Sequence, residues 1–122
     1  MNMCTFIGVE CLAVNALISL YENGIDKIGF QQLAEYGLSV VEQYRRENKA
    51  EAVLIFNPDD IQGLVINYSD FFDILEEGEK KFICLKTGVE ILELKEHFRW
   101  TLSYAMLKAL SQVNVMDAMR QG

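Results

Sequence analysis

The stretch Met1–Tyr21, MNMCTFIGVECLAVNALISLY, contains one charged residue, Glu10, and no lysine or arginine. Most of its other side chains are apolar, and the few small polar ones gather on a narrow stripe of a helical wheel. A helix that is apolar around most of its circumference must be covered by the rest of its chain or by a partner. The sequence therefore predicts a helix over about Met3–Tyr21 that lies in the core or at an interface.

Length and composition set the scale of the fold. At 122 residues the chain is expected to form a single helical domain over 1–122. Hydrophobic residues make up 51% of the chain and charged residues 24%, proportions that suit a globular protein. A small domain this rich in apolar residues tends to leave a patch for a partner, most often a second copy of itself. We therefore expect a homodimer.

Periodicity and capping residues predict further helices. Apolar residues at three- and four-residue steps indicate a second helix over about Phe30–Asn48. The segment Asn57–Asp60, NPDD, is typical of a helix start, with Asn57 as N-cap, proline at the first position and acids at the positive end of the dipole. We expect a second short helix over 71–75 and a weakly amphipathic tail over 113–119.

The last long helix is expected to run from Thr87 to about residue 110, because Thr87 and Glu90 match a capping box. Two short apolar runs, 52–56 and 81–85, are strand candidates, although periodicity alone cannot separate a strand from a buried helical turn. If both are strands, they could pair as one ribbon. The expected fold is thus mainly α, with about five helices in a compact bundle and at most this one two-stranded ribbon.

The charge of the chain is concentrated in one stretch. Seven acids and no basic residues lie between Asp59 and Glu79, and this number equals the net charge of −7. An acidic chain with a pI near 4.6 repels phosphate backbones. Broad nucleic-acid binding is therefore disfavoured.

A nucleic-acid-binding regulator that uses helix 30–48 is nevertheless an alternative function. The segment 33–39, LAEYGLS, looks like the core of a helix-turn-helix domain, and Arg45 and Arg46 follow it. Ala34 and Gly37 are three residues apart, whereas the motif places its alanine and glycine four apart. The helical period also continues through Gly37, which favours one uninterrupted helix.

The location of the protein is inferred from its cations and cysteines. The first basic residue is Lys27, so the apolar start lacks the cationic region of a signal peptide, and polar residues interrupt it as a membrane span. Cys4, Cys11 and Cys84 are an odd number without a C-x-x-C pair. We expect free thiols, a cytoplasmic protein and no membrane association.

Three residues are candidates for chemistry. Glu93 lies four residues before His97, the only histidine, so the pair could supply two ligands of a metal site that would still need others. Glu10 lies among apolar residues and would be a site carboxylate, an ion-pair partner or an exposed residue at a helix end. A second alternative function is therefore an enzyme or ligand-binding protein that uses Glu10 or the Glu93/His97 pair.

The chain contains no phosphate-binding glycine loop and no nucleophile elbow, and we expect no cofactor, no metal and no catalytic residue. The leading hypothesis is a non-catalytic cytoplasmic protein-interaction module that forms a homodimer and that can bind a further protein partner. Its contact residues are expected on the apolar first helix and on a second apolar stripe of the last helix: Phe6, Leu17, Tyr21, Val89, Trp100 and Leu107.

Overall fold

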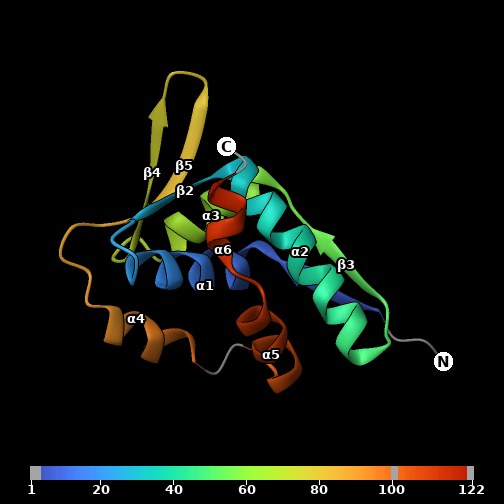
Figure 1. Ribbon diagram of the computed structural model, residues 1–122. Coiled ribbons are helices and arrows are strands. Elements are labelled where there is room, and N and C mark those ends of the chain that lie inside the picture. The colour runs from blue at the N-terminus through green and yellow to red at the C-terminus, as the bar shows by residue number, and fades with distance from the viewer. Residues whose placement is uncertain (1–3, 100–101, 121–122) are drawn as a thin grey trace.

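The computed structural model describes residues 4–99 and 102–120 (Figure 1). Helices and strands are interspersed along this part of the chain. In order they are β1 (Thr5–Gly8), α1 (Val9–Tyr21), β2 (Lys27–Gly29), α2 (Phe30–Asn48), β3 (Ala52–Ile55), α3 (Pro58–Asn67), β4 (Phe72–Glu77), β5 (Lys80–Leu85), α4 (Ile91–Phe98), α5 (Tyr104–Gln112) and α6 (Val115–Met119). The fold is mixed α/β with two sheets, so the expected all-α bundle with one short ribbon is wrong.

The apolar N-terminal stretch is a strand followed by a helix. Thr5–Gly8 forms β1, and the helix begins only at Val9, with Gly8 in extended conformation as its N-cap. The run Thr5–Ile7 is β-branched and aromatic, which favours a strand. Because the whole stretch is apolar, the change from strand to helix leaves no sign in its polarity pattern. The predicted single helix over Met3–Tyr21 is therefore wrong over Thr5–Gly8 and correct from Val9 onward.

The two strand candidates are strands, but they do not pair with each other. β3 pairs in parallel with β1, so that Phe6 lies opposite Val53 and Gly8 opposite Ile55. β5 lies between β2 and β4 and pairs with both in antiparallel orientation. The expected ribbon of 52–56 with 81–85 is thus wrong, because β3 pairs with β1 whereas β5 pairs with β2 and β4.

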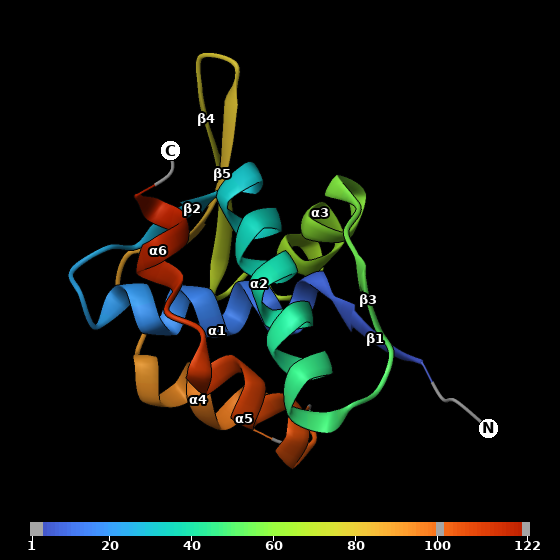
Figure 2. The ribbon, with the colours of Figure 1, turned by 45° about the vertical axis from the view of Figure 1, so that its right-hand side comes forward.

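The predicted helix over 71–75 is strand β4. It forms a hairpin with β5, and the turn is closed at Gly78, whose φ of 64° lies in the left-handed region that glycine adopts readily. Both views show this hairpin projecting away from the helices (Figures 1 and 2). Cross-strand packing against β5 decides the conformation of this short apolar run.

The predicted helix from Thr87 to residue 110 is two helices. Gly88 adopts φ 85° in a turn, so Thr87 does not cap a helix and Glu90 is the N-cap of α4. A new helix, α5, starts after Ser103, whose hydroxyl accepts a hydrogen bond from the Met106 amide at 3.2 Å. Residues 100 and 101, between the two helices, lie outside the described residues.

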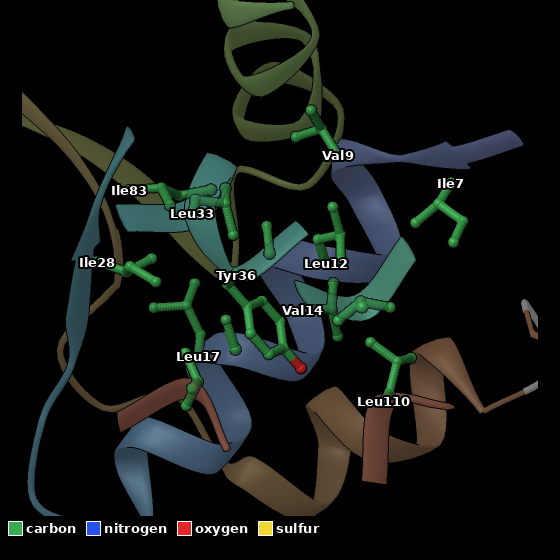
Figure 3. Packing of buried hydrophobic residues seen from close by; sticks show 14 of the residues in the cluster. Ile7, Val9, Leu12, Val14, Leu17, Ile28, Leu33, Tyr36, Ile83 and Leu110 are labelled. Carbon is green, nitrogen blue, oxygen red and sulfur yellow. The ribbon is translucent and has the colours of Figure 1, made fainter. Parts of the chain in front are cut away.

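The core is built around α1. Seven of its thirteen residues are buried, and α2, α3, α4 and α6 contact it. Figure 3 shows Leu12 and Leu17 of α1 beside Leu33 and Tyr36 of α2, with Ile28 of the second sheet nearby. The first helix is therefore covered, as expected, and the elements that cover it belong to the same chain.

Candidate functional site

The residues proposed for chemistry lie exposed on two helices, α1 and α4. Glu93 and His97 are exposed on α4, and the His97 ring packs edge-on against Tyr68 at a centroid distance of 5.4 Å. Glu10 is exposed in the first turn of α1, where the helix dipole favours a negative charge. Among the described residues, no group of three or more histidine, cysteine, aspartate or glutamate side chains could hold a metal ion.

Two ionisable side chains at the core, Cys11 and Tyr36, are held in their neutral forms. Burial raises the pKa of the Cys11 thiol, which lies within 3.3 Å of the Gly8 carbonyl oxygen as a hydrogen-bond donor. Burial also raises the pKa of the Tyr36 phenol, and the nearby Cys11 adds to that shift. A thiol with a raised pKa is a poor nucleophile because little thiolate is present. Both groups therefore behave as core residues.

The basic residues proposed to contact nucleic acid bind other parts of the chain. The Arg45 guanidinium donates to the Ala52 carbonyl, with a distance of 2.9 Å from its Nε. Arg46 forms an ion pair with Glu42 at 3.2 Å. Helix α2 also continues without a break through Gly37, so it contains no turn of a helix-turn-helix motif.

A groove of about 480 Å³ lies between the first turn of α2 and the β4–β5 hairpin. Phe30, Phe82 and Met119 contribute apolar side chains to its wall, and Glu79 and Lys80 contribute charges of both signs. These features select no particular ligand, because charges of both signs line an open, partly apolar groove.

The six residues expected at an interface are scattered. Leu17 is in the core, Val89 is half-buried, and Trp100 lies outside the described residues. Three are exposed, but on three different elements: Phe6 on β1, Tyr21 on α1 and Leu107 on α5.

Phe6 belongs to an apolar surface that sequence reasoning missed. Its pairing with Val53 places both side chains on the same side of the β1–β3 sheet, and Ile55 follows two positions later on that side. Phe6 is 68% exposed, Val53 39% and Ile55 45%. We define the outer face as the side of this sheet that carries Phe6, Gly8, Val53 and Ile55.

The opposite side of the β1–β3 sheet is buried against α2. A Cβ placed on Gly37 of α2 would lie 2.8 Å from Cδ1 of Leu54, so the helix and β3 approach each other closely. The Thr5 hydroxyl donates to the Tyr44 hydroxyl at 3.2 Å. These contacts fix which side of the sheet remains uncovered.

The sequence offers no signal for the outer face, because apolar residues occupy both the inward and the outward positions of TFIG and AVLI. The face is defined only once the two strands are paired.

Comparison of the chain with protein-family models, curated protein sequences and solved structures gives no match. Within the described ranges, each helix is too short or too polar to cross a bilayer.

Proposed function

We propose that this chain is a non-catalytic protein-interaction module whose docking surface is the outer face of the β1–β3 sheet, and that the protein it binds there is a second copy of itself. The observation that carries the proposal is the exposure of Phe6, Val53 and Ile55 on a parallel sheet. Parallel sheets are covered on both faces in nearly all known folds, whereas in the described part of the chain this sheet is covered on one face, by α2. A second protein that contacts Phe6 removes part of the exposed apolar surface from water.

The distribution of charge favours a copy of the chain as the partner. Two chains with a net charge of −7 repel each other, so they can meet only where charge is absent. The outer face residues Phe6, Gly8, Val53 and Ile55 carry no charge, and the acids of 59–79 lie on α3, on the β4–β5 hairpin and in the segments next to them. An uncharged surface on an acidic molecule is therefore the one suited to self-association.

The compartment proposed for this module is the cytoplasm. Cys4, Cys11 and Cys84 are free, and Cys4 is exposed beside the outer face. An exposed free thiol is maintained in a reducing compartment.

The substitution Phe6→Asp tests the proposal. It should weaken the dimer roughly 100-fold or more, because losing a buried aromatic anchor from an interface costs about 2–4 kcal/mol. It should leave the monomer folded, since Phe6 is largely exposed there. Sedimentation equilibrium gives the dissociation constant, and thermal unfolding monitored by circular dichroism reports the fold.

Leu92→Asp is the matched control. Leu92 is also an apolar side chain with high exposure, 78%, and its helix α4 lies away from the β1–β3 sheet in both views (Figures 1 and 2). This variant should dimerise like the wild type. If the two variants dimerise equally well, the outer face is not the docking surface.

A further inference from the structure

We propose that the two copies join through the free edge of β1, which pairs in antiparallel orientation with β1 of the second copy around a twofold axis at Phe6. The product is a continuous four-stranded sheet in the order β3–β1–β1–β3. This inference rests on the proposed function, because it specifies how the second copy meets the outer face: the two outer faces become one continuous face, and the two Phe6 side chains contact each other at its centre.

The hydrogen bonds of β1 identify its free edge. The Thr5 amide donates to the Glu51 carbonyl at 3.0 Å, so the backbone groups of Thr5 point toward β3. Successive residues of a strand direct their backbone groups to opposite edges, so the N–H and C=O of Phe6 point away from β3. An edge of this kind is a template for another strand.

The other edge of the same sheet is obstructed. On β3, the Ala52 carbonyl accepts a hydrogen bond from the Arg45 guanidinium. The side chain that donates it comes from α2, so that helix flanks this edge. Natural proteins protect strand edges with charged side chains, with proline or by covering them. Cys4, which precedes the strand, and residues 5–8 of β1 have no charge and no proline, and this leaves β1 as the edge that is open to pairing.

Phe6 is the centre of the pairing because of its position in β1. The outward-pointing backbone groups belong to Cys4, Phe6 and Gly8, and Phe6 is the middle of the three. A twofold axis at Phe6 pairs it with itself and places Cys4 opposite Gly8 of the second copy. Both Phe6 rings then lie side by side on the outer face, where Val53 of each copy flanks them.

A disulfide between Cys4 and a cysteine at position 8 tests this register. In the variant Gly8→Cys, the native Cys4 of one copy faces the new thiol of the other, at a Cα separation of about 5.5 Å that suits a disulfide. Gly8 has φ −105°, and a Cβ there meets nothing within 4 Å, so the substitution is compatible with the monomer. The expected result is that mild oxidation converts most of the chain to a covalent dimer on a non-reducing gel, with loss of the monomer band.

Two controls contain one of the two thiols each: the wild type, and the double variant Cys4→Ser/Gly8→Cys. Each of these positions is two residues from the axis, so the two copies of the same position are offset by four residues along the paired strands. They are then at least roughly 13 Å apart, beyond the reach of a disulfide, so neither control should form the covalent dimer. Cys11 and Cys84 are present in all three proteins and therefore cannot explain a difference.

Light scattering of the reduced Gly8→Cys variant separates the two proposals. If this variant is a dimer but forms no more covalent dimer than the controls, the register is wrong and the proposed function stands. If both it and the wild type are monomers, the proposed function fails.

Hydrogen exchange on the wild type covers the case in which the Gly8→Cys variant does not fold. The Phe6 amide should exchange roughly tenfold more slowly at concentrations where the dimer forms than on dilution. Equal rates at both concentrations would overturn the β1 pairing.

Discussion

Leu17→Asp is expected to abolish the folded state, whereas His97→Ala should cost about 1 kcal/mol or less. Leu17 is fully buried on α1, so the aspartate would be an unpaired charge in the core. That penalty is several kcal/mol, comparable to the ~5–15 kcal/mol by which a domain of this size is stable. His97 is exposed and loses only ring contacts, such as the one with Tyr68.

Urea unfolding monitored by circular dichroism measures both effects. The conservative variant Leu17→Met controls for side-chain shape at the same position and should lose less than about 1.5 kcal/mol. Equal destabilisation by Leu17→Asp and His97→Ala would contradict the position of α1 at the centre of the core and would indicate that His97 has a structural role.

Gly37→Val should lower the free energy of unfolding by about 3 kcal/mol. The first added carbon alone would lie 2.8 Å from Cδ1 of Leu54 and 2.9 Å from Cδ1 of Leu12. Leu12 is fully buried, so either the two leucine side chains leave their packed positions or α2 moves away from the β1–β3 sheet. Either change would disturb the sheet that carries the proposed docking surface, so we also expect weaker dimerisation.

Gly63→Val provides the comparison, since Gly63 is also within a helix, α3, and a Cβ there meets nothing within 4 Å. The change in helix propensity is then nearly the same, and this variant should alter stability by less than about 1 kcal/mol. The difference between the two variants in the free energy of unfolding, measured with urea, gives the cost of placing a side chain at Gly37 against Leu54 and Leu12. A difference under roughly 1 kcal/mol would mean that the sheet does not pack on α2 at Gly37.

Local signals in the sequence predicted some elements correctly. The predicted second helix, Phe30–Asn48, agrees with α2, and Asn57 caps α3 by accepting a hydrogen bond from the Asp59 amide at 2.9 Å. In both cases the signal lies within a few residues of the structure that it specifies: a helical period, or an N-cap followed by proline and acids.

The errors in the fold come from contacts between residues far apart in sequence. Thr5–Gly8 is a strand because Ala52–Ile55 lies beside it, and β4 is a strand because it pairs with β5. Short apolar runs are compatible with helix or strand, and the pairing partner decides between them. The predicted capping box at Thr87 does not form, because Gly88 has a left-handed φ that a helix cannot contain. The sequence motif does not reveal this conformation.

The proposed docking surface is predictable only in part for the same reason. Phe6 is a predicted interface residue because it lies in the apolar N-terminal stretch, and it is exposed on β1. Val53 and Ile55 are not predicted, since they join Phe6 through a pairing that spans more than forty residues of the chain. Leu17 belongs to the same apolar stretch as Phe6 but is buried, and apolarity alone does not separate core from interface.

The mass of the wild-type protein in solution shows whether two copies associate. Light scattering after size exclusion at micromolar concentration should give about twice the chain mass of 14.0 kDa, and the mass should fall toward that of one chain on dilution. A mass of one chain at every concentration would contradict the proposed dimer, because no second copy would then contact the outer face of the β1–β3 sheet.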